Sequence, residues 1–254
     1  VAVTSAFRAL IPYAAPIAAV VVVVLALANL RGVRESGRAF AVPTYLFIGL
    51  TYLMFAVAGV RAAAGSLPPA ESATMPVTQT TAVGGILTAV LLLRAFASGC
   101  TALTGVEAIS NGVPAFRAPQ ARNAAATLVA MGMIAITMFG GITVLALALS
   151  PRAEPTGNPS VLSQLAASSF GAGSALFSLS QAATAGILIL AANTAFNGFP
   201  LLASLLARDS YLPRQLGQRG DRLVFSNGVL LLAGVAAALI LGFNANLEAL
   251  LHLY

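Results

Sequence analysis

Side chains that could bind a cation or carry a proton gather around Glu107. Thr104, Glu107 and Ser110 follow one another at intervals of three residues, and Asn111 lies four residues after Glu107. At this spacing a helix places hydroxyl, carboxylate and amide oxygens along a single face. Oxygen atoms are the ligands that hard cations prefer. The spacing therefore predicts a site for a cation or a proton on this face.

The segment around Glu107, residues 84–114, has the pattern of an interrupted membrane helix. An apolar run ends there in small and polar residues, among which are Ser98, Gly99 and Gly105. Glycine weakens helical backbone, and nearby hydroxyls can bond the backbone groups that a break frees. A carboxylate at the centre of a membrane helix costs ~2.5–3.5 kcal/mol on insertion scales, so Glu107 is a functional candidate by default. The alternative is a protonated Glu107 that hydrogen-bonds a neighbouring helix.

The composition places the chain in a bilayer. Hydrophobic residues make up 59% of its 254 residues and charged residues only 8%, a balance that soluble domains do not have. All thirteen basic residues are arginines, and nearly all lie between apolar segments, so membrane topology explains them better than nucleic-acid binding does. The single cysteine and single histidine exclude an internal disulfide, a Cys/His zinc site and a Cys–His nucleophile.

Apolar segments near the ~20 residues that cross ~30 Å of hydrocarbon recur along the chain. They cover residues 11–30, 42–60, 84–114 with its interruption, 124–149, 171–206 and 223–243, and another begins at 246–254. The sequence therefore predicts a single all-α transmembrane domain with six complete crossings. A short interfacial helix is expected after the turn residues near Asn158. Because the chain starts without Met and stops within an apolar segment, we expect it to be part of a longer transporter.

The longest apolar segment, residues 171–206, carries amides at its centre. Its 36 residues would form ~54 Å of helix, which must tilt, bend or project beyond the bilayer. Asn193 and Asn197 are four residues apart and therefore share a face. Such residues either join helices or line a site, and the sequence leaves both readings open.

Arginines are distributed unequally between the two ends of the predicted spans. One face receives Arg8, Arg61 and Arg152, and Arg94 lies within a span. The other face receives nine arginines: Arg31, Arg34, Arg38, Arg117, Arg122, Arg208, Arg214, Arg219 and Arg222. Cytoplasmic loops carry the excess of positive charge. The loops 31–41, 115–123 and 207–222 are therefore expected to be cytoplasmic, in a multi-pass protein of the cytoplasmic membrane.

Several motifs together resemble a known family. They are NLRGVRESG, FASGCTALTGVEAISNGVPAFRAPQARNAA, AANTAFNGF and LLARDSYLPRQL. These motifs are similar to the amino acid–polyamine–organocation (APC) superfamily, and within it to KimA-type potassium importers, which are similar to the KUP proteins. The resemblance covers nearly the whole chain, and TALTGVEAISN is its most specific part. It implies a LeuT-like fold of two inverted five-helix repeats, of which this chain runs from the end of the third span into the tenth.

The resemblance also implies a function and a site. Proton-coupled potassium uptake is expected, with potassium held by Thr104 and Glu107 of a broken sixth span and by Tyr254 of the tenth. The remaining ligands of the family come from the first and third spans, which these 254 residues do not include. No cofactor is implied beyond the transported ion and proton. The expected surroundings are the lipid bilayer, and a homodimer is a candidate assembly.

Three other readings stay open. An APC-type amino acid permease would use the same helix break to bind a larger substrate. An intramembrane enzyme would need Ser98 or Ser110 beside Glu107 and a positioned base, yet the only histidine, His252, is distant in sequence; the chain is therefore not expected to be an enzyme. A purely structural membrane subunit would make Glu107→Gln silent.

Overall fold

The computed structural model describes residues 2–31, 37–75, 85–100, 113, 116–152, 159–218, 225–246 and 249–250. Every regular element within these residues is an α-helix or a 3₁₀ helix, so the all-α prediction is confirmed. The helices cluster into two compact units. The larger unit comprises Val1–Ala73 with Leu145–Tyr254, and the smaller one comprises Thr74–Val144.

Four helical segments among the described residues are long and apolar enough to cross a membrane: Ala9–Leu30, Phe40–Ala63, Gln120–Leu149 and Ala175–Arg208. The first joins the 3₁₀ helix η1 (Arg8–Tyr13) to α2 (Ala14–Leu30), and the others belong to α3 (Gly37–Ala63), α6 (Gln120–Leu149) and α8 (Ala175–Arg208). At most 17% of the residues in their most apolar windows are buried. Such exposed apolar surface fits helices that contact lipid.

Shorter helices complete the described chain. They are α1 (Ala2–Ala6), η2 (Glu71–Thr74), α4 (Ile86–Cys100), α7 (Val161–Phe170), η5 (Arg214–Gly217) and α9 (Ser226–Gly242). With 15 and 17 residues, α4 and α9 are apolar but shorter than the ~20 residues of a straight span. The smaller unit contains α4 and most of α6.

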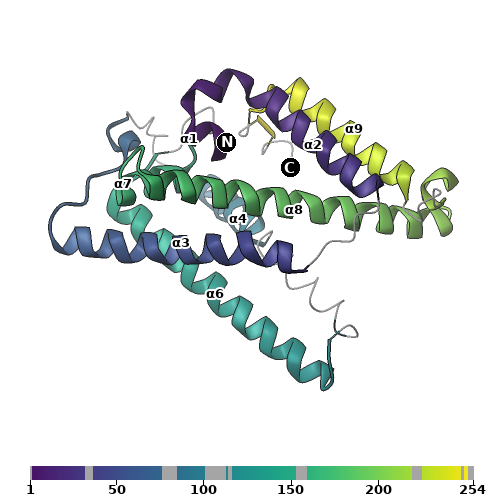
Figure 1. The fold of residues 1–254 in the computed structure, drawn as a ribbon, viewed down its shortest axis with the longest axis horizontal. Coiled ribbons are helices and arrows are strands. Elements are labelled where there is room, and N and C mark those ends of the chain that lie inside the picture. Colours follow the sequence, from purple (N-terminus) through teal and green to yellow (C-terminus); the bar gives the residue numbers. More distant parts are fainter. Residues whose placement is uncertain are drawn as a thin grey trace. The chain divides into compact units, whose positions relative to one another are not determined.

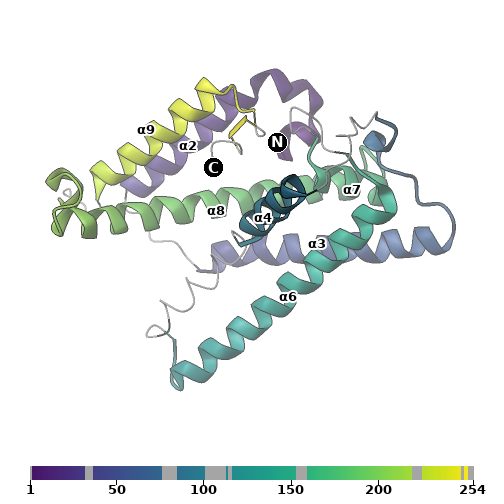
Figure 2. The ribbon, with the colours of Figure 1, turned by 180° about the vertical axis from the view of Figure 1, so that it is seen from behind.

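The larger unit is held together by α2, α8 and α9. Figures 1 and 2 show α9 lying alongside α2, and both helices contact α8. Their shared core consists of Leu25 and Ala26 of α2, Phe196 of α8 and Val229 of α9, all of which are buried. The contact between α8 and α9 is closest at Gly228, where an added Cβ would lie 2.9 Å from Pro200 Cα. Only glycine therefore fits at this crossing.

The helix α3 begins at Gly37, which is earlier than the predicted segment 42–60. Its first turns fall within residues 31–41, which the sequence assigned to a loop because of their charges. Because the helix begins at Gly37, Pro43 lies inside it. Membrane helices tolerate proline because neighbouring groups satisfy the freed backbone. Pro43 packs against α8, where a Cβ added at Gly186 would lie 3.3 Å from Pro43 Cβ.

The short helix expected after Asn158 is α7. Its N-cap is Ser160, whose side chain accepts a hydrogen bond from the Ser163 backbone N–H at 3.3 Å. It stops at Gly171, whose φ of 92° is a conformation that glycine adopts readily. Six of its ten residues are buried, so α7 is packed into the larger unit rather than lying open on its surface.

Candidate functional site

Most residues of the predicted ion site lie outside the described residues. These are Thr104, Gly105, Glu107, Ser110 and Tyr254. The site drawn from the sequence and from the family resemblance therefore stays a prediction.

The two other residues of the predicted break, Ser98 and Gly99, belong to the last turn of α4. The backbone is helical through both residues and as far as Cys100. An added Cβ at Gly99 would have no neighbour within 4 Å, so this glycine is not required by close packing against the residues that the structure describes. An interruption of this helix would accordingly begin after Cys100.

The two amides of α8 have different surroundings. Asn193 is 7% exposed, and its Oδ1 accepts a hydrogen bond from Asn29 Nδ2 of α2 at 2.7 Å. The same Asn29 amide donates to the Leu25 carbonyl at 2.8 Å. Asn193 thus joins α2 to α8, whereas Asn197 is exposed and keeps its side chain at the surface of the described unit. A lining role is better suited to Asn197 than to Asn193.

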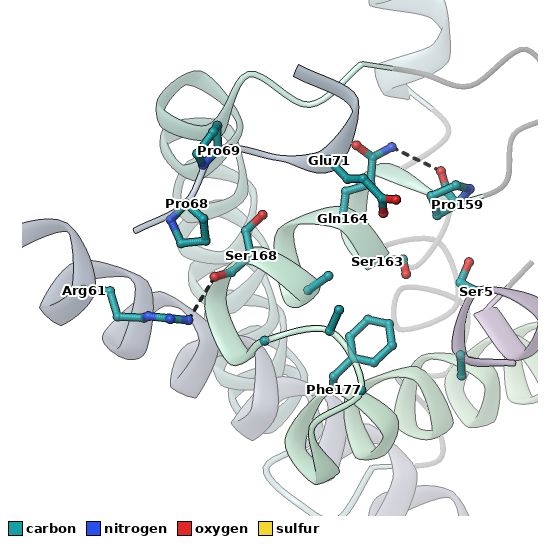
Figure 3. A pocket seen from close by; sticks show the side chains of 15 residues that line it. Ser5, Arg61, Pro68, Pro69, Glu71, Pro159, Ser163, Gln164, Ser168 and Phe177 are labelled. Carbon is teal, nitrogen blue, oxygen red and sulfur yellow. Dashed lines mark hydrogen bonds between the residues drawn. The ribbon is translucent and has the colours of Figure 1, made fainter. Parts of the chain in front are cut away.

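A cavity of about 750 Å³ lies where the C-terminal end of α3 meets η2, α7 and the start of α8. Figure 3 shows its walls, to which α1 also contributes. Its polar lining includes Ser5, Arg61, Glu71, Ser163 and Ser168, and Phe177 of α8 closes one side. Sequence reasoning did not identify this cavity, because its residues come from four separate parts of the chain.

One wall of the cavity is fixed by Gln164. This side chain is 3% exposed, and its Nε2 donates to the carbonyls of Arg152 at 3.0 Å and Pro159 at 3.3 Å. Its Oε1 accepts a hydrogen bond from the Ser72 hydroxyl, which in turn accepts from the Arg152 backbone N–H at 2.7 Å. A buried amide with these partners is satisfied and costs little to desolvate. The network therefore holds α7 against η2.

The other end of α7 is held by Arg61, in the last turn of α3. Its Nη1 donates to the carbonyls of Ser168 at 3.1 Å and Ser169 at 2.8 Å. These carbonyls belong to the last turn of α7, where helices leave carbonyls unpaired and where a positive charge is favourable. Arg61 therefore acts as a cap supplied by another helix. The sequence indicated this role only in part: Arg61 is one of the three arginines on the face that has few of them, but nothing in the sequence pointed to α7 as its partner.

The apolar helices define a multi-pass protein of the cell membrane. A family model described as amino acid permease matches residues 6–254. Since this match covers nearly every residue, the chain belongs to the amino acid permease family. The APC resemblance seen in the sequence motifs is thereby confirmed, and the class is that of transporters rather than enzymes.

One relative of the chain is the potassium transporter KimA of Bacillus subtilis (strain 168). The two sequences are 46% identical over 254 residues, which is 100% of this chain and 40% of KimA. The chain thus spans about two fifths of the length of this relative. The similarity to KimA-type proteins that the motifs indicated is confirmed at this level.

Proposed function

We propose that the complete protein to which this chain belongs takes up potassium across the cytoplasmic membrane, driven by proton entry. The observation that carries the proposal is the 46% identity to a potassium transporter, sustained over all 254 residues. Because the match covers only 40% of that relative, the activity is proposed for a longer protein rather than for this segment.

In the proposed mechanism, Glu107 is the charged ligand of the ion and Thr104 supplies a neutral oxygen one helical turn earlier. Tyr254 would add a third oxygen from the tenth span. A LeuT-like fold would place these groups at a helix break that follows Ser98 and Gly99 at the end of α4 and includes Gly105, where freed backbone carbonyls add to the ligand set. Ser110 and Asn197 would line the approach to this site. Loss of a proton from Glu107 makes its carboxylate available to the cation, which couples the two movements.

The test is Glu107→Gln in the complete protein. An amide has nearly the same shape as the carboxylate but cannot lose a proton, so uptake and coupling should both fail. We expect this variant to be expressed normally and to lose potassium-dependent growth of a host that lacks its own potassium uptake. Growth equal to that of the wild type would contradict the proposal, and is what a purely structural subunit predicts.

Thr104→Ala should have a milder effect. Loss of one neutral ligand costs about 1–3 kcal/mol if its partner is left unsatisfied, so the half-saturating potassium concentration should rise about ten-fold or more. Thr143→Ala is the matched control, because the Thr143 hydroxyl donates only to the Phe139 carbonyl of its own helix at 2.8 Å. Equal effects of the two substitutions would show that the change at Thr104 is not specific to the site.

The second candidate is an amino acid permease, which the description of the matching family favours. In that case the same helix break would bind the amino and carboxylate groups of the substrate. Wild-type protein would then accumulate a labelled amino acid in reconstituted vesicles and would fail to rescue the potassium-deficient host. This outcome would replace the potassium proposal and leave Glu107 as a proton carrier or a packing residue.

A further inference from the structure

The last turns of α8 expose an apolar face. Four leucines on this face are between 45% and 62% exposed: Leu201, Leu202, Leu205 and Leu206. The other side of the same turns carries Ala203 and Ala207, which are buried against Leu216 of η5. A contiguous apolar surface on a membrane helix fits contact with lipid acyl chains. This surface continues to within two residues of Arg208.

Positive charge begins where the apolar face stops. Arg208 follows Leu205 by three residues and Leu201 by seven, so it shares their face of α8. The next arginine, Arg214, is also exposed and belongs to η5. Tyr211 lies between the two arginines and is 79% exposed. Tyrosine favours the headgroup level of a membrane, because its ring is apolar and its hydroxyl is polar. The surface therefore changes from apolar to aromatic and basic, as it does where acyl chains give way to headgroups.

The turn that carries these residues is packed in place at the end of α8. The Tyr211 backbone N–H donates to the Leu206 carbonyl at 2.9 Å, which closes the chain back on the helix. Leu216 of η5 is buried against α8, and Asn227 Nδ2 of α9 donates to the Gln215 carbonyl at 2.7 Å. Because η5 is held by both helices, its arginine stays near the end of α8. Such a fixed arrangement lowers the entropy that a ligand must give up on binding.

The two guanidinium groups are available to a ligand. Within the part of the chain that the structure describes, neither Arg208 nor Arg214 has a side-chain hydrogen bond or an ion pair. Asp209 is the one carboxylate in residues 207–218, so the turn keeps a net positive charge. The fork of a guanidinium matches the oxygens of a phosphate. An occupant of this surface must therefore be apolar beside the leucines and anionic beside the arginines.

We propose that the end of α8 binds an anionic phospholipid, whose phosphate contacts Arg208 and Arg214 and whose acyl chains lie on the four exposed leucines. Such a lipid combines both chemistries in one molecule. Anionic lipids give the cytoplasmic leaflet its negative surface potential. Both arginines belong to the nine-arginine face, which is the one expected to be cytoplasmic. The inference is independent of whether the complete protein transports potassium or an amino acid.

The experiment measures lipid binding to the purified complete protein by native mass spectrometry. Phosphatidylglycerol is the anionic probe, and phosphatidylcholine is the zwitterionic one. We expect the wild type to bind phosphatidylglycerol several-fold more tightly. Arg208→Gln combined with Arg214→Gln should raise the phosphatidylglycerol dissociation constant about ten-fold or more and leave that of phosphatidylcholine unchanged. Arg208→Lys combined with Arg214→Lys keeps the charge and should retain the preference, which separates loss of charge from damage to the fold.

Two controls make the result specific. Arg117→Gln combined with Arg122→Gln removes the same charge from exposed arginines of the same face, around the start of α6, and should leave the preference unchanged. An equal loss in this protein would show that binding follows total charge, and would overturn the site. The other control is sn-glycerol 3-phosphate, which has the phosphate without acyl chains and should not displace the lipid.

Displacement by sn-glycerol 3-phosphate at concentrations similar to those of the lipid would define a site for soluble phosphates and overturn the lipid assignment. Equal affinities of the wild type for phosphatidylglycerol and phosphatidylcholine would overturn it as well. The exposed leucines would then fit contact with another segment of the longer protein.

Discussion

Single polar side chains determine where the apolar helices of this protein meet. Asn29 Nδ2 lies 2.7 Å from Asn193 Oδ1 and 2.8 Å from the Leu25 carbonyl, so both of its N–H groups have acceptors. In a bilayer no water competes for these groups, and the alternative partners are few. The contact therefore fixes the position of α2 along α8. The surrounding Leu25, Phe196 and Val229 add buried apolar surface, which is less specific about how far one helix is shifted along the other.

We expect Asn193→Ala to lower the free energy of unfolding of the complete protein by about 0.5–2 kcal/mol, the range found for hydrogen bonds between membrane helices. The measurement is unfolding by a denaturing detergent in mixed micelles. Combining it with Asn29→Ala should cost less than the sum of the single changes, because the two side chains share one bond. Asn197→Ala is the control and should have no effect, since Asn197 is exposed. Strictly additive losses would show that the bond does not couple the helices.

Two glycines of α9 give a second test at this scale. An alanine at Gly228 would bring its Cβ to 2.9 Å from Pro200 Cα and Cβ, whereas at Gly234 no atom lies within 4 Å. Because the Pro200 backbone cannot move aside cheaply, Gly228→Ala should destabilise the protein by about 1–3 kcal/mol. Gly234→Ala should leave the stability unchanged or slightly higher, since alanine favours a helix. Equal stabilities in the same unfolding measurement would show that α8 and α9 do not pack this closely.

At the scale of elements, the sequence predicted the apolar helices better than their ends. Hydropathy identified α2, α6 and α8, because each needs about 20 apolar residues whatever its neighbours are. It missed the start of α3, since Arg38 lies in a stretch whose charges resemble those of a loop and yet belongs to the helix, in which arginine is favourable. The cavity could not be predicted either. Its wall depends on Ser72, Arg152 and Gln164, which are up to 92 residues apart and show no common spacing.

The cap that Arg61 provides makes a prediction about α7 as a unit. Arg61→Gln removes the charge that two carbonyls of the last turn share, so that end of α7 should open more often. We expect faster hydrogen exchange in residues 161–170 and a loss of stability of about 1–2 kcal/mol. Arg208→Gln removes an equal charge from the last turn of α8 and should leave exchange in α7 unchanged. Unaltered exchange in Arg61→Gln would mean that the Gln164 network alone fixes the helix.

At the scale of the whole molecule, the described helices of the larger unit run in the directions that the arginine pattern requires. Figures 1 and 2 show that α2 and α8 end on the same side of this unit, where Arg31 and Arg208 follow or close the helices. The helix α3 ends on the other side, where Arg61 contacts α7. Arg31 and Arg208, which are far apart in the sequence, thus lie at the same end of the larger unit. The ion site has no comparable support, because its predicted ligands lie outside the described residues.

This arrangement predicts the orientation of the protein in the membrane. If the arginine-rich end is cytoplasmic, a cysteine placed at Ser36 or Gln218 in a protein with Cys100 replaced should resist a membrane-impermeant thiol reagent added to intact cells. A cysteine at Ser66 should react, because this exposed residue follows α3 just beyond Arg61, at the opposite end. Permeabilised cells provide the control, since all three positions should then react. The orientation depends on the total excess of arginine in the cytoplasmic loops rather than on any single arginine. Only a reversal of the nine-to-three distribution should therefore invert the protein in the membrane. Labelling of Ser36→Cys and Gln218→Cys in intact cells, with Ser66→Cys protected, would show that the protein has the opposite orientation, with the cavity beside α7 on the cytoplasmic side.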